Sequence, residues 1–139
     1  MAIAAEAAHR QADPLVLTGR AENHIRGVHD LDDTIARLIA YHDAGADVVY
    51  APGLSDLDQV AAVVKAVGVP LNVLALPHGP SVAELASVGV RRISTGGALA
   101  RSAYGALLAG ARELLADGTS SYAAGGPSRD ALEAAFVRR

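Results

Sequence analysis

The residues that directly follow four short apolar segments of the sequence are the candidates for chemistry. They are Arg20, Glu22, Asn23 and His24 after the first segment, Pro52 and Gly53 after the second, Pro77, His78 and Gly79 after the third, and Ser94, Thr95, Gly96 and Gly97 after the fourth. In parallel sheets and barrels, functional groups gather where the strands end and the following loops begin. Arg20 is the most informative, because a guanidinium at a strand end holds a carboxylate or phosphate through two parallel hydrogen bonds. Two interpretations stay open: Arg20 binds an anionic substrate, or it pairs with Glu22 or another acid as a structural clamp.

The other residues behind the apolar segments have weaker signals. The turn at 94–97 leads into a predicted helix, whose free amide groups favour an anion, but small residues there also serve tight strand-to-helix packing. His24 and His78 are candidates for acid or base chemistry, but a loop histidine without a chemical role explains each of them better. The five histidines have no pairing of the zincin kind, so the sequence predicts no zinc site.

Two further groups of charged residues have structural explanations. Asp30, Asp32 and Asp33 cluster at a predicted helix start, where the helix dipole stabilises carboxylates, so helix capping explains them better than metal binding. Arg91 and Arg92 precede or begin a predicted strand, far from the expected functional rim, and are interpreted as solvated side chains.

The elements that position these residues form a repeated pattern of short apolar runs and longer amphipathic segments, which is typical of parallel strands joined by helices. The predicted strands are Leu15–Gly19, Asp47–Ala51, Pro70–Ala75 and Val90–Ser94. Glycines at 45, 68 and 89 are expected to end three helices in the left-handed conformation. The predicted helices begin after caps at Asp30 and Ser55, at the capping box of Ser81 and Glu84, and at about residue 98, and a short last helix covers about residues 129–137.

Four parallel strands, each followed by a helix, fit either a small doubly wound domain or half of an eight-stranded barrel. The turn after the first strand lacks the Gly-x-Gly-x-x-Gly fingerprint and the Gly-Lys-Ser/Thr motif, which weakens a nucleotide-binding interpretation. A complete barrel takes about 250 residues, so a chain of 139 residues would supply about half. The sequence therefore predicts an α/β fold, half of a (β/α)8 TIM barrel.

The composition of the chain argues against several classes of partner and of chemistry. The formal net charge is -3, which does not favour nucleic acid or an anionic membrane surface as a partner. Hydrophobic residues make up 51% of the chain and charged residues 19%, a balance that buries a core. The absence of cysteine excludes disulfides and thiolate chemistry. With no apolar run of membrane-spanning length and no signal-peptide pattern, we expect a cytoplasmic protein.

Several segments, in the same order, resemble the isocitrate lyase and phosphoenolpyruvate mutase superfamily, specifically its small bacterial phosphonomutase-like members. The segments are Leu17–Asn23, Ala44–Gly53, Pro70–Leu74, Gly89–Ser94 and Ala98–Tyr104. The resemblance covers about residues 15–122 and implies the second half of a (β/α)8 barrel. It also implies Mg²⁺-assisted cleavage or formation of a C–C or P–C bond in small 2-oxo acids or phosphonates.

Only some of the family's functional residues have a counterpart in this chain. Arg20 corresponds to the arginine that holds the anionic end of the substrate, Glu22 to the acid two positions later, and Asn72 to the Pro-x-Asn-Val pattern of the small members. These three are the predicted substrate-binding residues, and no catalytic residue is assigned. The family's Asp-x-Asp metal cluster and mobile loop have no counterpart in residues 1–13, so the Mg²⁺ ligands are expected outside this chain. Pro52 stands where other branches have an acid or a histidine.

Two functions are compatible with these residues: the C-terminal half of a lyase or mutase that is inactive without its metal-binding half, and a non-catalytic half-barrel that acts in assembly or regulation. We expect residues 1–13 to form an N-terminal helix or tail, 14–118 the half-barrel with strands five to eight, and 119–139 a linker and C-terminal helix. The expected partners are a small anionic substrate such as a 2-oxo acid and further copies of the chain, contacted through the C-terminal helix.

Overall fold

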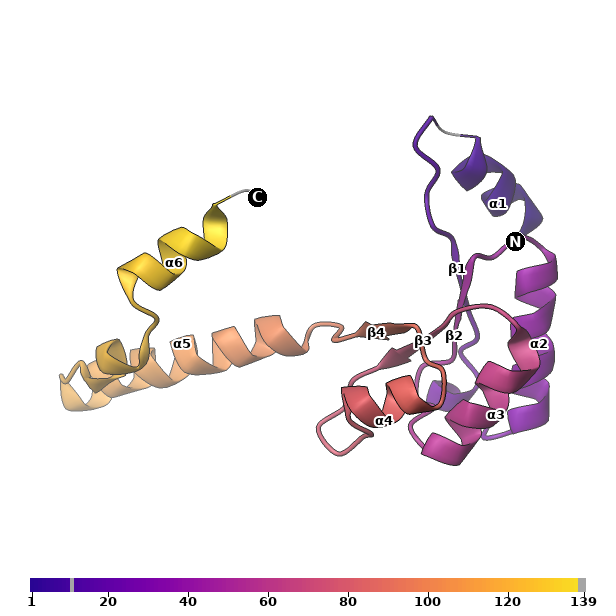
Figure 1. Ribbon diagram of the computed structural model, residues 1–139. Helices are drawn as coiled ribbons and strands as arrows, with labels where there is room; N and C mark the ends of the chain where they lie inside the picture. Colours follow the sequence, from indigo (N-terminus) through magenta and orange to yellow (C-terminus); the bar gives the residue numbers. More distant parts are fainter. Residues whose placement is uncertain (11, 138–139) are drawn as a thin grey trace. The chain divides into compact units, whose positions relative to one another are not determined.

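A computed structural model describes residues 1–10 and 12–137 (Figure 1). The strands are β1 (Thr18–Arg20), β2 (Val48–Tyr50), β3 (Leu71–Leu74) and β4 (Arg92–Ser94). The α-helices are α1 (Ala2–His9), α2 (Leu31–Asp43), α3 (Leu57–Val67), α4 (Val82–Ser87), α5 (Ala98–Asp117) and α6 (Arg129–Phe136), and the 3-10 helices are η1 (His24–Arg26) and η2 (Ser121–Gly125). The chain divides into two compact units, Met1–Gly96 and Gly97–Arg139. Position 11 of the expected N-terminal segment and positions 138 and 139 of the C-terminal one lie outside the described residues.

The four strands form one parallel sheet in the order β1-β2-β3-β4. This confirms the prediction of four parallel strands in consecutive order, each followed by a helix. Each strand is shorter than predicted, because only three or four residues of each apolar segment join the hydrogen-bonded ladder. Within the described residues, β1 and β4 each pair with one neighbour, so they are the two edges of the sheet.

The helices of the first unit begin and end at side chains and glycines of the expected kinds. The carboxylate of Asp30 accepts the N–H of Asp33 at the start of α2, and Ser81 and Glu84 form a complete capping box at α4. The cap of α3 was predicted at Ser55 and is Asp56 instead, whose carboxylate accepts the N–H of Gln59 at 2.9 Å. A carboxylate also interacts favourably with the helix dipole. Gly45, Gly68 and Gly89 have φ angles of 98°, 69° and 92°, which confirms the predicted left-handed helix ends.

The two faces of the sheet differ in chemistry. One face, here the core face, presents Val49, Leu71 and Val73 to the apolar side chains of α2, α3 and α4, among them Leu38, Val60 and Leu85. Side chains alternate along a strand, so the residues between these point to the other side. The opposite side, here the open face, carries Thr18, Arg20, Val48, Tyr50, Asn72, Leu74, Arg92 and Ser94. The apolar core therefore lies between the sheet and the helices, and the polar strand residues lie on the open face.

The second unit consists of α5, η2 and α6. Tyr122 of η2 packs close to Gly110 of α5, where a side chain on the glycine would meet the tyrosine ring. Together with Leu107 and Leu114, these residues line a shallow apolar groove of about 260 Å³. None of the described helices in either unit has the length and apolar character that a membrane-spanning segment requires.

Candidate functional site

One row of side chains crosses the open face from edge to edge. Arg20 is the register partner of Tyr50, Tyr50 that of Asn72, and Asn72 that of Arg92. Register partners in neighbouring strands project from the same face, so the four side chains form a continuous polar band across the sheet. The structure thus places Arg20 and Asn72, both predicted as substrate-binding residues, on the same face and in the same row.

Arg20 ends β1, and its guanidinium has two neighbours. The carboxylate of Glu22 accepts a hydrogen bond from Nε, and Cζ lies 5.3 Å from the centre of the Tyr50 ring. A cation over an aromatic face is attracted by the ring quadrupole. Within the described residues, neither terminal nitrogen of the guanidinium donates to a partner, and half of the side chain is exposed. Glu22 therefore holds the Nε side of the guanidinium and Tyr50 contacts its face, while the two terminal nitrogens have no protein partner among the described residues.

Asn72 is the most buried residue of the row, with 2% of its surface exposed. Its Oδ1 accepts a hydrogen bond of 2.9 Å from Nη1 of Arg92, and its Nδ2 donates one of 3.0 Å to Oγ of Ser94. The expectation that Arg92 is merely solvated is therefore wrong, because its register in β4 places it directly beside the Asn72 amide. Arg91, which precedes β4, is exposed as expected.

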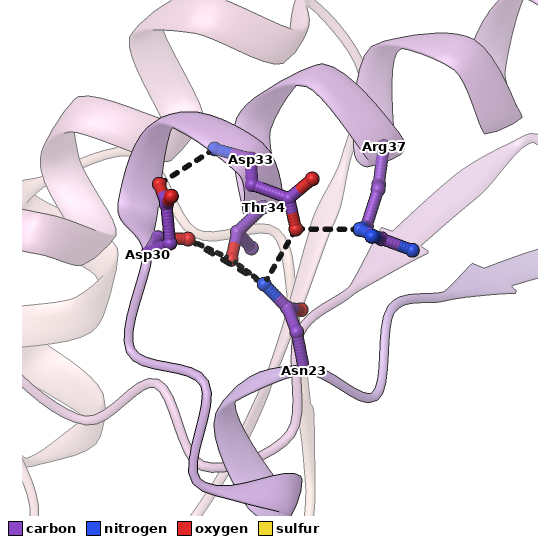
Figure 2. A network of polar contacts seen from close by, with 5 residues as sticks. All are labelled: Asn23, Asp30, Asp33, Thr34 and Arg37. Atoms are coloured by element: carbon purple, nitrogen blue, oxygen red, sulfur yellow. Dashed lines mark hydrogen bonds and ion pairs between the residues drawn. The ribbon is translucent and has the colours of Figure 1, made fainter.

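A separate polar network anchors the loop that follows Arg20 and Glu22. The Asn23 amide donates to the Thr34 hydroxyl, with longer contacts of 3.4 Å to the Asp30 carbonyl and 3.5 Å to the Asp33 carboxylate (Figure 2). Arg37 donates to the same Asp33 carboxylate at 2.6 Å. Of the three acids that the sequence analysis assigned to helix capping, Asp30 caps α2 with its carboxylate. The Asp30 carbonyl and the Asp33 carboxylate also tie the loop to the first turn of this helix.

His24 is buried in the same loop. The residue is 6% exposed, and its ring stands edge-on to His29 with 5.6 Å between ring centres. Its Nε2 atom has no hydrogen-bond partner among the described residues. Burial of the ring, with a smaller contribution from the charge of His29, lowers the pKa of His24 below its ordinary value. His78, in the loop after β3, is exposed. The two histidines therefore have different environments, although the sequence analysis gave them the same interpretation.

A Mg²⁺ centre needs several oxygen donors, such as carboxylates, close together. No group of three or more His, Asp or Glu side chains in residues 1–10 and 12–137 comes together in a way that could hold a metal ion. Glu22, the acid at the end of β1, is engaged by Arg20. The donor set of this part of the chain does not fit a Mg²⁺ site.

Sequence reasoning missed Tyr50 and the contribution of Arg92. Tyr50 ends the apolar run of β2 and was counted only as part of that strand. Its role depends on the β1–β2 register, which is set by pairing between segments 30 residues apart. One sequence signal could have identified Tyr50. It stands directly before the loop that follows the second strand, just as Arg20 stands directly before the loop that follows the first.

Comparison with known proteins assigns the chain to a family. Residues 1–115 match the sequence model described as "Phosphoenolpyruvate phosphomutase". A crystal structure of a "putative lyase/mutase" from Burkholderia cenocepacia J2315 is 49% identical, with a TM-score of 0.87 over 99% of this chain and 50% of that chain. The structure of 2,3-dimethylmalate lyase, a PEP mutase/isocitrate lyase superfamily member, is 28% identical, with a TM-score of 0.74 over 86% of this chain and 43% of that chain.

A curated relative agrees with these matches. Oxaloacetate decarboxylase of Paraburkholderia xenovorans (strain LB400) is 32% identical over 90 residues, which are 65% of this chain and 28% of that protein. The chain thus spans half or less of the length of these relatives, and its four βα units are a partial TIM barrel. On the family match over residues 1–115, the chain belongs to the phosphoenolpyruvate phosphomutase family, within the PEP mutase/isocitrate lyase superfamily.

Proposed function

We propose that this chain is the C-terminal half of an enzyme that cleaves or forms C–C or P–C bonds in small 2-oxo acids or phosphonates. In this proposal, Arg20 binds the anionic end of the substrate, Glu22 orients Arg20, and Asn72 contributes to the same site. The observation that carries it is the Arg20 guanidinium at the end of β1, held at Nε by Glu22 and at its face by Tyr50, with both terminal nitrogens unengaged by the described residues.

The chemistry of the guanidinium supports an anionic ligand. Its two terminal N–H groups lie in one plane, and a carboxylate or phosphonate accepts both at once, with each charge-assisted bond contributing about 1.5–3 kcal/mol. A guanidinium is charged at every relevant pH, so this contact does not depend on protonation. A relative supports the same class, because oxaloacetate decarboxylase is named for a 2-oxo dicarboxylic acid.

The resemblance to the superfamily also implies Mg²⁺, which stabilises an enolate next to the bond that breaks. The donors of residues 1–10 and 12–137 do not fit such a site, so its ligands would come from the other barrel half. The residues of this chain bind and orient the anion, and no chemical step is assigned to them.

We propose three segments for the chain. Residues 1–13 form the N-terminal helix or tail, 14–118 the half-barrel, and 119–139 the linker and C-terminal helix through which copies of the protein associate. The proposed location is the cytoplasm, and the proposed partners are a small anionic substrate and further copies of the chain.

The experiment that tests the proposal is calorimetric titration of the protein, with any chain that co-purifies with it, using oxalate, pyruvate and sulfate. Arg20→Lys removes the planar fork and keeps the charge, so we expect a loss of affinity for oxalate of about tenfold or more. Arg26→Lys, in the same loop and exposed, is the matched control. If binding is unchanged while Tm falls, Arg20 is a structural clamp and the proposal is wrong.

A second candidate, a non-catalytic half-barrel, is favoured by the lack of a metal-binding cluster among the described residues. Both candidates predict that the chain by itself leaves oxaloacetate and phosphoenolpyruvate intact in the presence of Mg²⁺. They differ when a polypeptide carrying the other barrel half is added, since only the first candidate predicts turnover in the mixture. Turnover by the chain alone that a chelator abolishes would contradict both.

A further inference from the structure

The amide of Asn72 is held at both ends on the open face. Its oxygen accepts from Nη1 of Arg92 at 2.9 Å, and its nitrogen donates to Oγ of Ser94 at 3.0 Å. With 2% of Asn72 exposed, water has little access to compete with these bonds. The two contacts therefore fix the orientation of the Asn72 amide, which could otherwise rotate by about 180° and exchange its oxygen and nitrogen.

The chemistry of Arg92, Asn72 and Ser94 determines which group donates in each hydrogen bond. A guanidinium has only N–H donors, so the atom of Asn72 that faces Arg92 must be the oxygen, and the nitrogen must face Ser94. The Ser94 oxygen then receives a hydrogen bond, and its own hydrogen is left to donate elsewhere. Among residues 1–10 and 12–137, the structure gives this hydroxyl no acceptor.

The position of Ser94 places its hydroxyl donor where a ligand can accept from it. Ser94 is the last residue of β4 and lies on the open face, two residues beyond Arg92 on the same strand. Arg20 is the last residue of β1 on that face. Ligands of parallel barrels bind at the carboxyl ends of the strands, which is where both groups are found.

We propose that Arg92, Asn72 and Ser94 form a donor relay, in which the Ser94 hydroxyl donates to an oxygen of the anionic ligand bound at the strand ends. Ser94 is a binding residue in this relay, and Arg92 is a positioning residue that acts through the Asn72 amide. Successive hydrogen bonds polarise one another, so the cation at one end strengthens the donor at the other. The relay rests on the proposed function, and it restricts the ligand to one with a hydrogen-bond acceptor facing β4, such as a carboxylate or 2-oxo oxygen.

The test uses oxalate as the probe and calorimetric titration of the protein with any chain that co-purifies with it. Ser94→Ala removes the donor and is expected to weaken oxalate binding about three- to tenfold, while Ser94→Thr keeps the hydroxyl and is expected to keep the affinity. Arg92→Met removes the N–H donors and is expected to produce a similar loss. Arg92→Lys, which can donate to the Asn72 oxygen, is expected to recover most of it.

A double-mutant cycle separates the relay from independent effects of its members. If Arg92 acts through Asn72 and Ser94, Arg92→Met causes little further loss of oxalate affinity once Ser94 is alanine. Additive losses would overturn the positioning role, because Arg92 would then bind the anion or stabilise the fold on its own. Thermal unfolding of every variant identifies a loss of fold, and Ser94→Ala alone decides the binding role if Arg92→Met does not fold.

The outcomes also separate the relay from the proposed function. If oxalate binding depends on Arg20 but is unchanged in Ser94→Ala, the relay is wrong and the proposed anion site stands. If the unsubstituted protein binds no oxalate, the proposed site is contradicted, and the role of Ser94 as a ligand donor with it.

Discussion

The two units of the chain are stabilised in different ways. The buried apolar residues of the described part all lie in Met1–Gly96, where strands and helices enclose them. In the second unit, Gly110 is the one buried residue among those described, and large apolar side chains such as Leu99, Leu115 and Phe136 are 71%, 87% and 84% exposed. The first unit therefore holds itself together by internal packing, whereas the second presents apolar surface that is typical of an association site.

The largest expected effect comes from removing a core side chain of the first unit. Leu38 of α2 is fully buried in the cluster between the helices and the sheet. Leu38→Ala is expected to lower the free energy of unfolding by about 2–5 kcal/mol, because it removes buried surface and leaves a cavity. Urea-induced unfolding measures the change.

The matched control is Leu115→Ala in α5, where the same atoms are removed from an exposed side chain. Measured at a concentration where the chain is monomeric, its expected effect is within about 0.5 kcal/mol. Equal losses for the two variants would contradict the contrast between the units.

The next effect concerns association through the second unit. Leu132 and Phe136 are exposed on α6, and burying such side chains stabilises an interface by about 1.5–3 kcal/mol each. Deletion of residues 128–139 is therefore expected to weaken self-association about tenfold or more, as measured by sedimentation equilibrium. An oligomer that persists unchanged after the deletion would show that α6 is not the contact.

A smaller effect is expected at the start of α2, where the first unit fixes its helix ends. Asp30→Ala removes the carboxylate that accepts the Asp33 N–H at 2.9 Å, at an expected cost of about 1 kcal/mol. Asp32→Ala, in the same turn and exposed, is the control and is expected to cost only a few tenths of this, roughly 0.3 kcal/mol. Similar costs for the two would mean that the helix dipole, rather than the cap, is responsible.

The smallest effect is a pH dependence confined to the first unit. Since burial lowers the pKa of His24 below 6.5, the unfolded chain takes up a proton at a higher pH than the folded chain does. Stability is therefore expected to be highest above about pH 6.5 and to fall as the pH drops toward the lower pKa of the folded state. His24→Gln should remove this slope from urea unfolding, and the exposed His78→Gln should leave it intact. A slope that survives in His24→Gln would assign it to other groups.

Local signals in the sequence were sufficient for much of the first unit. The capping box of Ser81 and Glu84 and the left-handed Gly45 depend on neighbouring residues only, and both are as predicted. The cap of α3 was placed one residue early, at Ser55, because two capping side chains stand side by side and the choice depends on the entry angle of the chain. The Arg92–Asn72 bond depends on the register between strands 20 residues apart, which no local signal encodes.

In the candidate site, too, local contacts were predictable from the sequence and contacts between strands were not. Arg20 and Glu22 are two residues apart, and the sequence analysis named Glu22 as one possible partner of Arg20; the structure shows this ion pair. Tyr50 and Ser94 come to the open face only through pairing of strands, and the burial of His24 depends on packing of its loop near Gly53. Whether Arg20, Glu22 and Asn72 bind a substrate stays a prediction.

The consecutive strand order has a consequence for how the sheet forms. Each strand pairs with the next one in the sequence, so contacts across the sheet join residues 20 to 30 positions apart, as in Arg92 with Asn72, Ser94 with Asn72 and Asp47 with Leu17. The loops to be closed are therefore short and nearly equal, and each closure costs a similar amount of chain entropy. The sheet can grow strand by strand from its N-terminal edge as the polypeptide is synthesised, with every new βα unit adding to a surface that already exists.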